Sequence, residues 1–158
     1  MNSEYSHSRD FQKALESLSG LEFMQKIAHG ELPQPPMGKT LGFRVVEADS
    51  GKVIFEGEPN SSHYNPIGSV HGGFASVLLD SAAMGCTVHT KLPAGIFYTT
   101  LELKINLVRA IQENTGMLRA TGSVIHCGRR TATVESRLED RSEKLYAHGT
   151  STCLIFSD

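Results

Sequence analysis

One stretch of the chain, residues 71–89, is small or apolar at nearly every position and predicts a buried helix. Asp80 is the only charged residue within it apart from the histidines at its two ends. An ionised carboxylate in apolar surroundings loses hydration and is costly unless it is paired. Because Asp80 lies too deep in the helix to serve as an N-cap, we expect it to have a chemical role.

Strands and short helices are predicted on both sides of this helix. Residues 10–29 have apolar side chains at helical spacing with a break near Ser19 and Gly20, which predicts one or two short amphipathic helices. The proline-rich residues 32–38 predict a linker. Alternating or apolar patterns predict strands at about residues 40–47, 52–59, 101–108, 116–127, 131–139 and 145–156.

Two strands, a buried helix and four further strands describe an α+β domain, an antiparallel sheet of about six strands wrapped around one long helix. We place this domain at residues 38–158, after an N-terminal helical extension and linker at residues 1–37. A length of 158 residues suits one such domain.

Composition narrows the function classes. A formal charge of −2 with no basic stripe argues against partners such as nucleic acid or an anionic membrane. Three widely spaced cysteines without a CxxC pair suggest neither a disulfide framework nor a zinc site. No segment resembles a signal peptide or a transmembrane helix, so we expect a cytoplasmic protein.

The start of the predicted helix is suited to binding an oxygen atom. The first N–H groups of a helix have no intrahelical acceptor, and Gly72 and Gly73 have no side chain to keep a ligand away. Partial positive charge at a helix start favours a developing oxyanion. In the alternative interpretation, His71, Gly72 and Gly73 form only a tight junction and Asp80 meets a basic partner.

The spacing of Gly72 and Asp80 points to a second copy of the chain. Eight residues at the helical rise separate them by about 12 Å, too far for both to contact one reacting carbon. If both act on one carbonyl group, an antiparallel helix of a second subunit must supply one of them across a two-fold axis. Two shared sites per dimer follow.

Other motifs are weaker. The chain lacks a GxGxxG motif, a P-loop, a GxSxG motif and an HExxH motif. His126 and Cys127 point to opposite faces of a predicted strand and are poorly placed to share a metal ion. Arg109, Arg129 and Arg130 are candidates for phosphate binding, although solvated arginines at strand ends are as common.

The combined pattern of Asn65, the triplet at residues 71–73, Asp80, residues 99–109 and the pair Gly128 and Arg129 resembles the hotdog-fold acyl-CoA thioesterases of the phenylacetate-degradation (PaaI-like) group. The resemblance covers about residues 38–156. It implies a hotdog fold with an extra N-terminal helical segment, and hydrolysis of a thioester without a metal or an organic cofactor. Coenzyme A would be part of the substrate.

The resemblance also implies roles for individual residues. The Gly72 N–H would polarise the thioester carbonyl, Asn65 would place the substrate or the attacking water, and Asp80 of the facing subunit would be nucleophile or general base. Thr100 would position water, Thr99 being the alternative within a loop. The other residues it places at the site are His71, Gly73, Arg109, Gly128, Arg129 and Arg130, the arginines as contacts for phosphates.

The expected assembly is a homodimer that shares its active sites, and beyond it a homotetramer. Two other functions stay open from the residues. A hotdog-fold hydratase or dehydratase would use a histidine such as His71 and a carboxylate for proton transfer at carbon. A non-catalytic acyl-CoA binding protein would share the fold without the chemistry.

Overall fold

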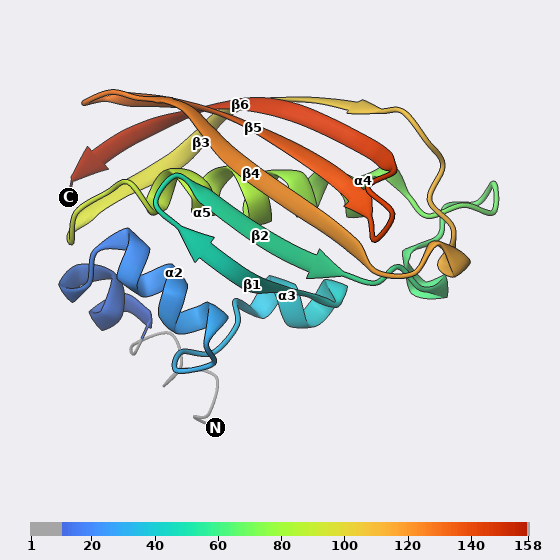
Figure 1. The fold of residues 1–158 in the computed structure, drawn as a ribbon, viewed down its shortest axis with the longest axis horizontal. Coiled ribbons are helices and arrows are strands. Elements are labelled where there is room, and N and C mark those ends of the chain that lie inside the picture. The colour runs from blue at the N-terminus through green and yellow to red at the C-terminus, as the bar shows by residue number, and fades with distance from the viewer. Residues whose placement is uncertain (1–10, 158) are drawn as a thin grey trace.

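The computed structural model describes residues 11–157, without the side chains of residues 81–83 (Figure 1). Six strands form one antiparallel sheet in the order β1-β2-β4-β5-β6-β3. Their bounds are β1 (Phe43–Asp49), β2 (Lys52–Gly57), β3 (Ile96–Leu107), β4 (Leu118–Cys127), β5 (Thr131–Asp140) and β6 (Leu145–Ser157). The predicted sheet of about six strands around one helix is confirmed, and the fold is a hotdog fold.

A continuous helical segment, residues 72–89, lies against one face of the sheet (Figure 1). It consists of α4 (Gly72–Val77), a π-helical segment η2 (Leu78–Gly85) and α5 (Cys86–His89). Leu78, Leu79, Met84 and Val88 of this central helix are fully buried and contact the inner faces of the strands. The predicted buried helix is confirmed, whereas its π-helical middle, which contains Asp80, has no sequence signal.

Strand β3 is longer than the sequence predicted. It begins at Ile96, so Thr99 and Thr100 lie within a strand and the predicted loop at these residues is wrong. A β-bulge interrupts the pairing of β3 with β6 between Thr100 and Glu102. The extra residue shifts the alternation of side chains, which re-aims the residues on either side of it.

The N-terminal region packs beside β1, the edge strand opposite β3. Residues 11–17 are helical, and α2 (Gly20–Ala28) follows after the predicted break. Ser19 caps α2 in a capping box with Glu22. The predicted linker is wrong at its end, where α3 (Pro36–Leu41) begins. A proline is tolerated at the first position of a helix. Because α3 occupies these residues, β1 begins only at Phe43.

The two edge strands differ in what covers them. The Gln34 side chain accepts a hydrogen bond from the Val45 N–H at 2.9 Å and donates one to the Val45 carbonyl at 3.3 Å. Gln25 of α2 donates to the Ala48 carbonyl at 3.2 Å. These side chains and α2 cover the edge of β1, which leaves β3 as the long edge strand of the sheet. In the described part of the chain, no helix is both long and apolar enough to span a bilayer.

Candidate active site

The central helix begins at a capped turn that leaves one donor unused. His71 is the N-cap, and its Nδ1 accepts a hydrogen bond from the Gly73 N–H at 2.8 Å. The His71 N–H donates to the His63 carbonyl at 2.7 Å, which fixes the entry of the chain into the helix. For the Gly72 N–H, the described residues provide no acceptor. This group is therefore available to an incoming oxygen.

The loop before the helix is built around Asn65. Its Oδ1 accepts hydrogen bonds from the Ile67 N–H at 3.0 Å and the Ser69 N–H at 3.4 Å, and its Nδ2 donates to the Ser69 hydroxyl at 3.0 Å. The Asn65 N–H also donates to the Ser69 carbonyl at 2.8 Å. Within one chain, Asn65 thus shapes a tight turn whose residues face the helix start.

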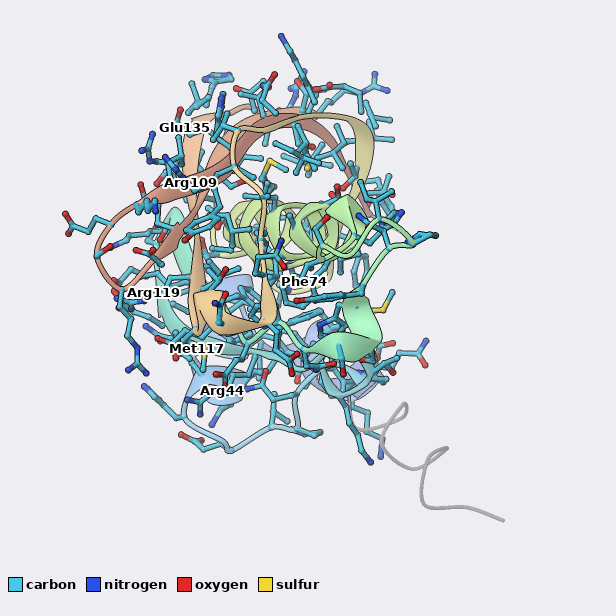
Figure 2. All side chains as sticks on the ribbon, turned by 90° about the vertical axis from the view of Figure 1, so that its right-hand side faces the viewer. Arg44, Phe74, Arg109, Met117, Arg119 and Glu135 are labelled. Atoms are coloured by element: carbon cyan, nitrogen blue, oxygen red, sulfur yellow. The ribbon has the colours of Figure 1, made fainter. Side chains whose placement is uncertain are left out.

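A cavity of about 280 Å³ lies at this helix start. Asn65, Gly72 and Arg109 line it together with the apolar side chains that follow β3. The end of the Leu107 side chain covers Gly72, since a Cβ added at Gly72 would lie 2.5 Å from Leu107 Cδ1. Figure 2 looks onto this end of the molecule, with Phe74 at the near end of the helix and Arg109 beside the sheet.

Asp80 lies two turns further along the helix and contacts β3. The Thr100 hydroxyl donates to Asp80 Oδ1 at 3.1 Å. Asp80 and Thr100 are half-buried, whereas Thr99 is exposed. Thr100 also pairs with Cys153 of β6 across the sheet, and burial raises the pKa of the Cys153 thiol. The Cys153 thiol next to Thr100 therefore keeps its proton.

The bulge in β3 explains how one strand reaches both parts of the helix. Thr100 contacts Asp80 and Leu107 covers Gly72, although the two residues are seven positions apart. An odd separation in a regular strand would place them on opposite faces. The extra residue in the bulge at Leu101 returns both side chains to the inner face.

The candidate phosphate contacts lie at opposite ends of the sheet. Arg109 donates to the Leu145 carbonyl at 3.3 Å, at the end where β6 begins. Gly128, Arg129 and Arg130 form the hairpin between β4 and β5, and both of these arginines are exposed. The ten residues of β5 separate the two ends by about 30 Å. One chain does not bring all three arginines to one ligand.

The site residues thus form two groups within one chain. We call Asn65, His71, Gly72, Gly73 and Arg109 the donor group, and Asp80 with Thr100 the acid group. Sequence reasoning missed the contacts that Ser69 and Leu107 make with the donor group, and Tyr98 beside the acid group. Tyr98 lies two residues before Thr100, so a strand extended by one more alternation would have predicted it on the same face.

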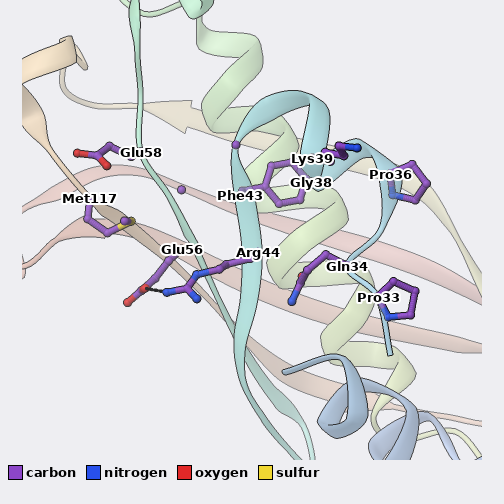
Figure 3. A pocket seen from close by; sticks show the side chains of 12 residues that line it. Pro33, Gln34, Pro36, Gly38, Lys39, Phe43, Arg44, Glu56, Glu58 and Met117 are labelled. Carbon is purple, nitrogen blue, oxygen red and sulfur yellow. Dashed lines mark ion pairs between the residues drawn. The ribbon is translucent and has the colours of Figure 1, made fainter. Parts of the chain in front are cut away.

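A larger hollow, of about 1030 Å³, lies beside α3 and the ends of β1 and β2 (Figure 3). Its wall includes Arg44, which is 3.7 Å from Glu56. Glu56 is also 3.4 Å from Arg119. None of the candidate site residues line the hollow, so it lies apart from both groups.

Comparison with known proteins identifies the family. A family model described as thioesterase superfamily matches residues 67–147, which is half of the chain and contains Gly72, Asp80, Thr100 and Arg109. The chain belongs to the thioesterase superfamily. As a member, it is a thioester hydrolase.

This thioesterase has relatives of known structure and name. It is 30% identical over 117 residues to a 1,4-dihydroxy-2-naphthoyl-CoA hydrolase of Listeria monocytogenes, a match over 74% of this chain and 91% of the relative. A phenylacetic acid degradation-related protein from Ralstonia eutropha has a similar structure, with a TM-score of 0.74 and 28% identity over 83% of this chain and 98% of that chain.

The phenylacetic acid degradation protein PaaI of Thermus thermophilus, solved as a mutant, gives a TM-score of 0.68 at 27% identity over 76% of this thioesterase and 98% of that chain. The resemblance to the PaaI-like group is therefore confirmed. The roles of the individual site residues stay predictions.

Proposed function

We propose that this thioesterase hydrolyses an acyl-CoA or aryl-acyl-CoA thioester to the free acid and coenzyme A, at sites that two copies of the chain share. The observation that carries the proposal is the division of the site. Gly72 and Asp80 lie on one continuous helix, about 12 Å apart, with different residues of β3 beside each. A donor and a carboxylate that far apart serve one carbonyl only if two helices contribute.

The open edge of β3 supports this pairing. The edge strand β3 has twelve residues and exposes the apolar side chains of Leu101, Leu103 and Leu107. Proteins usually protect or cover an apolar edge of this length. A second copy placed antiparallel against β3 by a two-fold axis would bring its donor group to the acid group of the first copy. The same operation would bring Arg109 of one copy to the end of the sheet that holds Arg129 and Arg130 of the other.

In this shared site the carbonyl oxygen would accept a hydrogen bond from the Gly72 N–H, whose strength increases as negative charge develops on the oxygen. Asp80 would act in one of two ways. As a base it would take a proton from water while the water oxygen attacks the carbonyl carbon, and the thiolate of coenzyme A would then leave. As a nucleophile it would attack the carbon itself and release the thiolate, and water would then hydrolyse the resulting anhydride.

Thr100 supports either route by holding the carboxylate through its hydroxyl group. His71, with its Nδ1 occupied by the Gly73 N–H, would stabilise the turn that presents Gly72. Asn65 would place the substrate or the attacking water from the turn that it shapes. The aryl-acyl part of the proposal draws on the naphthoyl-CoA hydrolase among the relatives. A tetramer made of two such dimers and a cytoplasmic location stay predictions.

The test is release of free thiol from a panel of aryl-acetyl, short-chain and medium-chain acyl-CoAs, with enoyl absorbance followed in parallel. We expect thiol release from at least one thioester. A change of enoyl absorbance without thiol would indicate a hydratase, and binding without turnover would indicate a binding protein. Either result would contradict the proposal.

A further inference from the structure

Next to the acid group, one aromatic ring fills a notch in the central helix. Gly85 lies against Tyr98 of β3, because a Cβ added at Gly85 would be 2.7 Å from Tyr98 Cε2 and 3.0 Å from its hydroxyl oxygen. The Tyr98 hydroxyl reaches the Cys86 sulfur at 4.0 Å. The ring of Tyr98 therefore occupies the space that a side chain at position 85 would take.

This notch is aligned with Asp80 along the helix. In the π-helical segment η2 the backbone hydrogen bonds join residue i to residue i+5, so Gly85 lies about one turn beyond Asp80. Thr100 and Tyr98 are two residues apart on β3, before the bulge, and share the inner face. Asp80 with Thr100 and Gly85 with Tyr98 thus form two successive contacts between the same helix and the same strand.

The ring is also supported from behind. The ring centroids of His89 and Tyr98 are 5.6 Å apart. The ring of Phe23 in α2 also contacts His89, with a centroid distance of 5.6 Å. Gly20, at the start of α2, packs directly on the His89 carbonyl. The N-terminal helix, which precedes the residues matched by the family model, therefore buttresses Tyr98 through His89. A ring held by these contacts has a defined position beside the acid group.

The direction of the substrate follows from the shared site. The reacting carbon must lie within about 3 Å of Asp80 or of the water that it activates. Coenzyme A carries charged phosphates, which favour the exposed arginines at the ends of the sheet. The acyl group, which is apolar, is then directed inward between the central helix and β3, where Tyr98 is the first large side chain beyond Thr100.

We propose that Tyr98, seated in the notch at Gly85, limits the length of the acyl group that the site at Asp80 accepts. The inference rests on the proposed function and identifies a residue that determines specificity. Burial raises the pKa of Tyr98 well above its usual range, so the ring keeps its proton and acts as a neutral wall. Removing the ring would open apolar space next to Asp80 and leave the reacting groups in place.

The experiment compares kcat/KM for saturated acyl-CoAs of four and ten carbons in the wild-type dimer, Tyr98→Ala, Tyr98→Leu and the control Tyr98→Phe. Each newly buried methylene group changes kcat/KM by about fourfold. We expect Tyr98→Ala to raise the long-to-short ratio at least tenfold and Tyr98→Leu to shift it in the same direction. Tyr98→Phe, which keeps the ring, should leave the ratio within about twofold.

A ratio, rather than a rate, separates specificity from damage, because a structural defect lowers kcat/KM for both substrates alike. If the wild type hydrolyses thioesters but the ratio is unchanged in Tyr98→Ala and Tyr98→Leu, the inference is overturned and the proposed function still holds. If the wild type released thiol from no thioester, the proposed function itself would fail. As a second readout, Gly85→Ala should destabilise the wild type more than it destabilises Tyr98→Ala, and equal effects would contradict the notch contact.

Discussion

The two edges of the sheet are built in opposite ways. At β1, the Gln34 side chain forms hydrogen bonds with the N–H and the carbonyl of Val45, Gln25 donates to the Ala48 carbonyl, and α2 packs alongside. At β3, Leu101 and Leu107 are more than half exposed, at 57% and 55%. An edge whose backbone groups are covered resists pairing with another chain, whereas an open apolar edge favours it.

The candidate site lies at the open edge. Both halves of the candidate site, Gly72 with Leu107 and Asp80 with Thr100, lie where the central helix meets β3. The β1 edge carries a hollow in whose wall Arg44 and Glu56 are paired. The comparison shows that one edge of this thioesterase is covered within the chain and that the other is open, which is the edge where the proposed second copy would pair.

The largest effect should come from the carboxylate on the β3 side. Asp80→Asn keeps the shape of the side chain but can neither attack nor accept a proton, so we expect kcat for a thioester to fall by about 10²-fold or more with little change in KM. The matched control is Glu56→Gln in the hollow at β1, which should leave kcat within about twofold. Steady-state kinetics on the two folded variants measure both effects. Normal turnover by Asp80→Asn would refute the catalytic role of Asp80.

A charged β3 edge should separate the subunits. Replacing Leu101 and Leu103 with lysines places like charges at the open edge, and we expect analytical ultracentrifugation to show monomers. Activity should then fall by about 10²-fold at concentrations where the protein is monomeric, because each site lacks one group. The control carries lysines at Met37 and Ile125, two exposed apolar residues outside β3. A fully active monomer would contradict the shared site.

The free energy of unfolding should decrease in acid because of a buried histidine that packs against α2. His89 is 4% exposed between Phe23 and Tyr98, and burial lowers its pKa from 6.5 to about 4. The unfolded chain therefore binds the proton first as the pH falls, so the stabilisation present above pH 6.5 is lost progressively down to about pH 4.

The loss attributable to His89 is about 3 kcal/mol of unfolding free energy. Urea unfolding between pH 7 and pH 4 measures it, and His89→Phe should remove most of this pH dependence. His63, whose pKa burial also lowers, should contribute a smaller slope that persists in the variant. An identical slope in the wild type and His89→Phe would show that the buried histidine does not titrate as described.

The smallest effect should come from uncovering β1. Gln34→Ala removes both hydrogen bonds to Val45, and because water can reach an edge strand, we expect the free energy of unfolding to fall by about 1 kcal/mol. Gln12→Ala, at an exposed position on the N-terminal helix, is the control and should be neutral. Activity of the folded protein should not change. A drop in kcat with unchanged stability would place β1 in the catalytic unit after all.

Much of the fold could be predicted from the sequence because its pattern is local. Residues 72–89 are small or apolar at nearly every position and carry one carboxylate, which predicts the buried helix and marks Asp80 as a candidate for a chemical role. Ser19 and Glu22 mark the start of α2 by their spacing alone. The hairpins between β4, β5 and β6 likewise follow from turn residues between alternating strands.

Other features depend on contacts that no local pattern encodes. The bulge at Leu101 and the π-helical turn around Asp80 are set by how helix and sheet fit together. Because the sequence pattern shows neither feature, it does not predict the strand at residues 96–100 or the position of Tyr98. The separation of Arg109 from Arg129 is a consequence of the strand order, which sequence periodicity does not determine.

The central claim, a site shared across β3, is tested most directly by mixing two inactive proteins. Asp80→Asn lacks the acid group, and Gly72→Val blocks the donor. The valine should be accommodated without loss of fold, since the atom that it meets is the mobile end of Leu107. After subunit exchange, confirmed by native mass spectrometry, half of the dimers are hybrids with one intact site in two.

About a quarter of wild-type activity should therefore return to the mixture of Asp80→Asn and Gly72→Val, provided that the two sites act independently. A mixture of Asp80→Asn with Asp80→Ala is the control and should stay inactive, because no hybrid of these two contains an Asp80. Hybrids of Asp80→Asn and Gly72→Val that form and stay inactive would contradict the account, since both groups would then have to act within one chain.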